Sequence, residues 1–189
     1  MSRTAFLDRD GTLNAEVDYL GDPRDLRVLP GVPAALRQLH DAGYRIVVVT
    51  NQSGIARGRF GEADLARIHA ALHAALGELP LAYLHCPHLP EGSHGYGGDC
   101  PCRKPKPGLL HQARELLGVD FAGGVLVGDS ARDLLMGRGL PLRTVLVHSG
   151  KDQATQRATL RDAGMAPDHE AADLAAAVAW LLADDRRSR

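Results

Sequence analysis

The sequence lacks a long hydrophobic run. Its longest apolar stretch, residues 174–183, is too short to span a bilayer and is predicted to form a helix instead. Only four uncharged residues lie between Arg3 and Asp8, so the N-terminus has no signal-peptide pattern. From both absences we expect a soluble, cytoplasmic protein that has no membrane partner.

Basic residues are not in excess either. The formal net charge of the 189 residues is −1, and no basic tract is present, which argues against a nucleic-acid-binding surface. Internal repeats and linker-like segments are also missing, and the length suits one domain with a sizeable core. We therefore predict a single, monomeric domain over residues 1–184, followed by a charged tail at residues 185–189 that frays.

Cysteine is scarce, and the three cysteines all lie between Cys86 and Cys102. In a reducing compartment, an odd number of clustered cysteines indicates a metal site more than a disulfide. Together with His88, the residues Cys86, Cys100 and Cys102 provide three thiolates and one imidazole, a set typical of tetrahedral structural zinc. We predict a zinc-bound loop over residues 86–102. Three cysteines without a metal are the alternative.

Strand patterns alternate with helical patterns along the chain. The expected strands are residues 3–7, 44–49, 81–85, 124–127 and 143–147. The expected helices are residues 31–42, 61–77, 108–118 and 130–138, with one or two more at the end, the last around residues 171–183. This alternation predicts an α/β fold with a doubly wound, mostly parallel sheet. Only about one loop and one helix separate Asp10 from Thr50, which leaves room for a minimal cap.

Carboxylates follow two of the expected strands. Asp8 and Asp10 come directly after the first strand, and Asp129 follows residues 124–127 with one glycine between. In an open α/β sheet, such strand ends face one crevice. Three acids crowded there repel each other unless a cation lies among them, and oxygen ligands suit Mg²⁺. One of Asp8 and Asp10 could attack phosphorus while the other transfers protons. A capped turn with solvated acids is the alternative.

Other segments fit phosphate chemistry as well. Thr50 follows a strand, where a hydroxyl can hold phosphoryl oxygens, although an ordinary helix N-cap gives the same pattern. Lys104 could neutralise the charge shared by nucleophile and phosphate, or lie in a basic surface turn. Asp133 could orient Lys104 or a metal-bound water, or merely favour the first turn of a helix. Arg57 and Arg59, on a Gly-rich loop, could clamp a distal phosphate or remain solvated.

These motifs, taken together and in order, resemble those of the haloacid dehalogenase (HAD) superfamily. The matching residues are Asp8-x-Asp10, Thr50, Lys104 and Gly128-Asp129-x-x-x-Asp133. Within the superfamily, the surrounding segments closely resemble the bacterial D-glycero-D-manno-heptose 1,7-bisphosphate 7-phosphatases. Those segments are residues 8–14, residues 49–58, Cys86-Pro87-His88 and residues 100–105.

The resemblance implies a Rossmann-like phosphatase with catalytic Mg²⁺ and structural Zn²⁺, acting on a small sugar phosphate. It implies Asp8 as nucleophile and Asp10 as general acid and then base, with Mg²⁺ held by Asp8, the Asp10 carbonyl and Asp129. Thr50 and Lys104 would bind the transferring phosphoryl group. The implied substrate contacts are Asn51, Gln52, Ser53 and Arg103. The product would enter synthesis of nucleotide-activated heptose for lipopolysaccharide or a related surface glycan.

Three alternatives remain open at this point. Histidinol-phosphate phosphatases share the Cys-x-His and Cys-x-Cys loop, but that loop is usually shorter than the eleven residues between His88 and Cys100. They also usually lack the segment Ser-Gly-Ile-Ala-Arg-Gly at residues 53–58. A non-catalytic, metal-stabilised binding domain would not require the four residues Asp8, Asp10, Lys104 and Asp129, all of which are present. A phosphoryl-transferring mutase usually needs a larger cap than this length allows.

Overall fold

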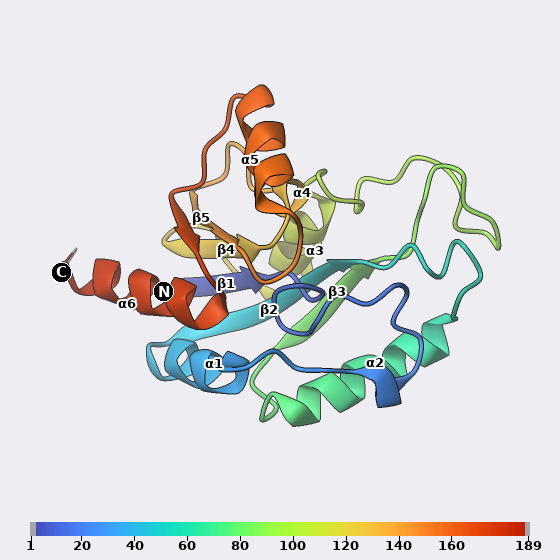
Figure 1. Ribbon diagram of the computed structural model, residues 1–189, viewed down its shortest axis with the longest axis horizontal. Helices are drawn as coiled ribbons and strands as arrows, with labels where there is room; N and C mark the ends of the chain where they lie inside the picture. The colour runs from blue at the N-terminus through green and yellow to red at the C-terminus, as the bar shows by residue number, and fades with distance from the viewer. Residues whose placement is uncertain (1–2, 188–189) are drawn as a thin grey trace.

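The computed structural model describes residues 3–187, in which one parallel sheet lies between two layers of helices (Figure 1). The sheet has six strands within the described residues, in the order β3-β2-β1-β4-β5-β6. The strands are β1 (Arg3–Leu7), β2 (Tyr44–Asn51), β3 (Ala82–Cys86), β4 (Gly124–Gly128), β5 (Leu142–Val147) and β6 (His169–Ala171). All neighbouring strands pair in parallel, so the predicted α/β fold is confirmed.

The helices divide between the two faces of the sheet. They are η1 (Pro23–Asp25), α1 (Val32–Asp41), α2 (Glu62–Ala75), α3 (Gly108–Leu117), α4 (Ala131–Leu135), α5 (Gln153–Asp162) and α6 (Leu174–Arg187). Buried side chains of α1, α2 and α6 pack on one face, while those of α3, α4 and α5 pack on the other. Figure 1 shows α1 and α2 below the sheet and α4 and α5 above it.

The apolar run in β2 follows from this double covering. Ile46 and Val48 belong to the core beneath α1 and α6, whereas Val47 and Val49 belong to the core beneath α3. Successive side chains of a strand point to opposite faces, so a strand covered on both sides needs apolar residues at every position. Branched side chains also suit the extended backbone.

The end of the chain differs from our prediction. We expected residues 185–189 to fray, but α6 continues through residues 185–187, and the remaining two residues lie outside the described part. The cause is Asp185, which is buried and accepts a hydrogen bond from the Tyr44 hydroxyl at 2.9 Å. Asp185 also forms ion pairs with Arg3 and Arg143. The short strand β6 was not predicted either.

The strand order places one crevice at the centre of the sheet. The chain winds outward from β1 to β2 and β3, then returns to the other side of β1 and continues through β4, β5 and β6. Connections on the two sides of such a reversal diverge, which opens a crevice at the carboxyl ends of β1 and β4. No helix among residues 3–187 is long and apolar enough to cross a membrane.

Candidate active site

Three aspartates meet at the crevice between β1 and β4. Asp8 follows β1, and its backbone N–H donates to the Val127 carbonyl of β4 at 2.9 Å. Asp129 follows β4, and Asp133 lies in α4. All three are buried, and carboxylate oxygens of the three lie within 4.8 Å of one another. We call these three residues the acidic cluster.

Lys104 lies inside the acidic cluster. Its Nζ is 2.6 Å from Asp8 Oδ1 and 2.8 Å from Asp133 Oδ1, and its side chain is 2% exposed. Burial alone would lower the pKa of Lys104, but the charges of Asp133 and Asp8 outweigh it and raise the pKa above its ordinary value. The group therefore remains an ammonium ion that bridges two carboxylates.

Asp133 has two partners, which answers the open question of its role. One oxygen accepts from Lys104, while the other accepts from the backbone N–H and the hydroxyl of Ser130 at 3.0 and 2.6 Å. The second pair of contacts forms the N-cap of α4. Asp133 is therefore a fixed anchor that holds the Lys104 ammonium beside Asp8.

The acidic cluster carries more negative charge than Lys104 neutralises. Burial and then the charge of Asp133 raise the pKa of Asp8 well above its ordinary value, with Lys104 acting in the opposite direction. Burial, Asp133 and Glu16 raise the pKa of Asp129 to about 7. A cation among these oxygens would relieve the repulsion and favour the ionised forms.

The surroundings of Asp129 fit a small oxygen-ligated cation. A Cβ atom on either Gly11 or Gly150 would collide with the Asp129 carboxylate, so the two loops can approach it only as glycines. The Lys151 backbone N–H donates to Asp129 Oδ2 at 2.9 Å and orients the carboxylate. Buried carboxylate oxygens fixed in this manner are suitable ligands for Mg²⁺.

Asp10 lies close to the cluster but has different partners. Arg9 donates four hydrogen bonds to the two Asp10 oxygens at 2.9 to 3.2 Å, and Asn14 and Gln52 donate one each at 2.9 Å. Burial would raise the pKa of Asp10, but the charge of Arg9 and these hydrogen bonds lower it below its ordinary value. Asp10 is thus an oriented carboxylate.

The end of β2 supplies neutral polar groups. Thr50 is buried, and its hydroxyl oxygen accepts from Gln52 Nε2 at 2.9 Å. The same Gln52 nitrogen reaches Asp10, so it links the two strand ends. Asn51 exchanges hydrogen bonds with the backbone of Lys104 at 3.1 and 3.3 Å. Asn51 therefore holds the loop that carries Lys104 against β2.

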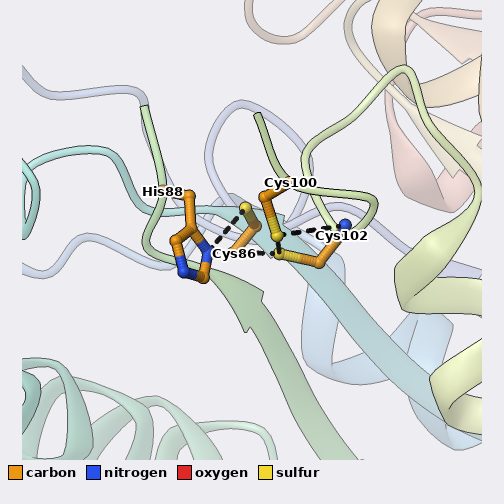
Figure 2. A group of neighbouring side chains, drawn as sticks. All are labelled: Cys86, His88, Cys100 and Cys102. Carbon is orange, nitrogen blue, oxygen red and sulfur yellow. Dashed lines mark hydrogen bonds between the residues drawn. The ribbon is translucent and has the colours of Figure 1, made fainter. Parts of the chain in front are cut away.

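The predicted zinc ligands converge on one point, as Figure 2 shows. Nδ1 of His88 lies 3.8 Å from the Cys86 sulfur and 3.5 Å from the Cys102 sulfur, and the sulfurs of Cys100 and Cys102 are 2.8 Å apart. Burial raises the pKa of the Cys86 and Cys102 thiols. Three sulfurs and one imidazole nitrogen, all within 4.8 Å of one another, form a donor set typical of structural Zn²⁺, which would hold the thiols as thiolates.

Two adjoining pockets open above the strand ends. The inner pocket is lined by the acidic cluster, Thr50 and Lys104. The outer pocket contains the four implied substrate contacts, which are Asn51, Gln52, Ser53 and Arg103. Asp10, Glu16, Asn51 and Arg132 line both pockets and make them continuous.

Among the pocket residues that the sequence did not predict are three charged ones. Glu16 and Lys151 form an ion pair at 2.6 Å from separate loops, and Arg132 projects from α4. Glu16 and Lys151 lie in segments without a motif, whereas Arg132 lies within the motif Gly128-Asp129-x-x-x-Asp133 and could have been found from it. Arg57 and Arg59 are exposed and are not among the described residues that line the two pockets.

Comparisons with known proteins agree with this geometry. A family model described as HAD-hyrolase-like matches residues 101–177. The D-glycero-beta-D-manno-heptose-1,7-bisphosphate 7-phosphatase of Haemophilus ducreyi is 44% identical over 155 residues, covering 79% of this chain and 85% of the relative. The D-glycero-alpha-D-manno-heptose-1,7-bisphosphate 7-phosphatase of Photorhabdus laumondii is 39% identical over 154 residues, covering 78% and 84%.

A solved structure is similar over nearly its whole length. It is the D,D-heptose 1,7-bisphosphate phosphatase from B. bronchiseptica complexed with magnesium and phosphate. The two chains are 36% identical, with a TM-score of 0.80, and the match covers 96% of this chain and 99% of the other.

The fold and the site define an enzyme of the HAD class that hydrolyses phosphoric monoesters. The chain belongs to the family of D-glycero-D-manno-heptose-1,7-bisphosphate 7-phosphatases, given the identity and coverage of its relatives. The resemblance seen in the sequence is thereby confirmed, and the alternative of a non-catalytic binding domain is set aside.

Proposed function

We propose that this protein removes the 7-phosphate of D-glycero-D-manno-heptose 1,7-bisphosphate in a Mg²⁺-dependent reaction. The observation that carries the proposal is the buried Asp8 carboxylate, 2.6 Å from the Lys104 ammonium and beside Asp129. The outer pocket supports a substrate with a second phosphate, because Arg103 and Arg132 both line it. The names of the relatives supply the particular sugar.

The reaction follows in two displacements. In the first, an Asp8 oxygen forms a bond to phosphorus as the bond from phosphorus to the sugar oxygen breaks. Asp10 transfers a proton to that oxygen, and because its pKa is lowered in the resting protein it must take up this proton before the step. In the second, water attacks the phosphorus of the aspartyl phosphate and Asp10 takes a proton from the water. The bond between phosphorus and the Asp8 oxygen breaks, which frees inorganic phosphate and restores the Asp8 carboxylate. Lys104 and the Thr50 hydroxyl hold the phosphoryl oxygens throughout.

Two metal sites complete the proposal. Asp8, the Asp10 carbonyl and Asp129 would hold Mg²⁺. When bound, the ion would neutralise negative charge on the phosphoryl group. The four residues Cys86, His88, Cys100 and Cys102 would hold Zn²⁺. All four zinc positions would then be filled by protein, so this metal would be structural.

The same proposal covers the cellular setting. We place the enzyme in the cytoplasm as a monomer, where its product would supply nucleotide-activated heptose for lipopolysaccharide or a related surface glycan. The relatives support the sugar but differ in the anomer that their names specify. The anomer is therefore part of the test.

The test is phosphate release from purified protein with Mg²⁺. The substrates are both anomers of heptose 1,7-bisphosphate, fructose 1,6-bisphosphate and histidinol phosphate. We expect a strong preference for the heptose, and we expect Asp8→Asn to abolish turnover with an unchanged melting temperature in Mg²⁺. A preference for histidinol phosphate would overturn the proposed substrate, and turnover by the Asp8→Asn variant would overturn the nucleophile.

A further inference from the structure

Arg9 is a buried cation whose guanidinium has two kinds of partner. The side chain is 1% exposed. Nε and Nη2 donate to Asp10, while Nη1 lies 3.3 Å from Nε2 of His69. A guanidinium can only donate, so the His69 nitrogen is the acceptor. The His69 side chain in α2 thereby fixes Nη1 of Arg9, the guanidinium nitrogen that does not contact Asp10.

His69 is well suited to accept this hydrogen bond. Its ring stacks on Tyr83 of β3, with centroids 4.8 Å apart and an interplanar angle of 25°. Burial and then the charge of Arg9 lower the pKa of His69 to about 3, so the imidazole is neutral at ordinary pH. A neutral ring held by stacking presents a lone pair in a fixed direction.

We propose that His69 is a positioning residue, which orients the Asp10 carboxylate through Arg9 for proton transfer to the leaving oxygen. The inference rests on the proposed function in one respect, the role of Asp10. Without an acceptor at position 69, Nη1 loses its partner in a buried site, so the guanidinium turns to find another. The Asp10 carboxylate, to which Arg9 donates at both oxygens, then keeps only Asn14 and Gln52 as fixed donors and is less precisely oriented.

The affected step can be isolated by the choice of leaving group. As the Asp8 oxygen bonds to phosphorus and the ester P–O bond breaks, a sugar oxygen must receive the Asp10 proton. A p-nitrophenolate is stable without a proton, so its departure does not require a positioned acid. A general acid contributes about 10²–10⁴ to a rate. Imperfect positioning should therefore lower kcat/KM for the sugar phosphate alone.

The experiment compares kcat/KM for heptose 1,7-bisphosphate and p-nitrophenyl phosphate. His69→Phe keeps the stack on Tyr83 but removes the acceptor, and we expect about a ten-fold loss for the sugar phosphate, a fraction of the acid's full contribution. The p-nitrophenyl ester should change less than about two-fold. His69→Gln restores an acceptor and should recover most of the loss. His73→Leu, one turn along α2, is the matched control.

Equal losses for both esters, or no loss for either, would overturn the inference. His69→Leu repeats the comparison if the phenylalanine variant does not fold. Should the wild type prefer another sugar phosphate, the proposed substrate fails, and the same ratio measured with that sugar phosphate still decides the role of His69.

Discussion

At the scale of single residues, the acidic cluster depends on the buried cation Lys104. The Lys104 ammonium contacts Asp8 and Asp133 and is almost inaccessible to water. Its positive charge offsets the negative charge of the two carboxylates in the resting protein. In the proposed reaction it also offsets the negative charge of the phosphoryl oxygens. Removing one partner of a buried charge cluster leaves the others uncompensated. Lys104 should therefore affect both activity and stability.

We expect Lys104→Met to lower kcat with p-nitrophenyl phosphate by about 10²–10³, similar to the loss of an oxyanion donor. Without Mg²⁺, its melting temperature should also fall, because Asp8 and Asp133 then face each other. The control is Lys106→Met, since Lys106 is half-exposed and pairs only with exposed Asp99 among the described residues. A Lys104→Met variant with wild-type turnover would contradict the role of this lysine.

Residues next to strand ends were predictable, and residues reached across the fold were not. Asp8 and Asp129 follow apolar strands, so a parallel sheet alone brings them together. The contact of Lys104 with Asp133 was one of the alternatives that the motif left open, and the structure contains it. The bond between Arg9 and His69 joins residues 60 positions apart in the sequence. A histidine in an amphipathic helix carries no local sign of such a partner.

At the scale of elements, α6 illustrates the same limit. Its apolar part was predicted, but the charged residues after it were expected to fray. Asp185 instead accepts a hydrogen bond from Tyr44 and forms ion pairs with Arg3 and Arg143. These three partners lie in three different strands. Composition reports that a segment is charged but not whether its charges have partners. These contacts thus hold the last turn of α6 against the amino ends of β1, β2 and β5.

We expect Asp185→Asn to reduce the free energy of unfolding by about 2 kcal/mol, because two partly buried arginines lose their carboxylate. This corresponds to a melting temperature lower by roughly 4–8 °C. The matched control is Arg186→Ala at the next position, which is exposed and should change the free energy by less than about 0.5 kcal/mol. Equal denaturation curves for the two variants would show that the end of α6 frays in solution.

At the scale of the whole molecule, the cysteine cluster and the acidic cluster share one loop. Cys102 and Lys104 are two residues apart, and Arg103 between them donates to the His88 carbonyl at 3.0 Å. Asn51 ties the Lys104 backbone to β2. If the cysteine cluster became disordered, the position of Lys104 should therefore become less fixed. A structural metal would in this way affect activity without contacting the substrate.

We expect Cys102→Ser to lose bound zinc and to lower the melting temperature by about 10 °C, since metal binding contributes folding energy. Activity should also fall, because less of the protein is folded and because Lys104 is held less firmly beside Asp8. The control is His94→Asn, because His94 lies in the same loop, is exposed and has a positive φ that asparagine tolerates. A wild-type protein purified without zinc, yet equally stable, would refute the structural metal.

The arrangement of the cysteine cluster also has a consequence for evolution. His88 and Cys100 lie side by side although eleven residues separate them, so the intervening segment leaves and returns at one place. Insertions, deletions and exchanges in such a segment do not have to move its ends. Residues 89–99, none of which lines the two pockets, can therefore change in length among descendants of this enzyme while Lys104 keeps its place.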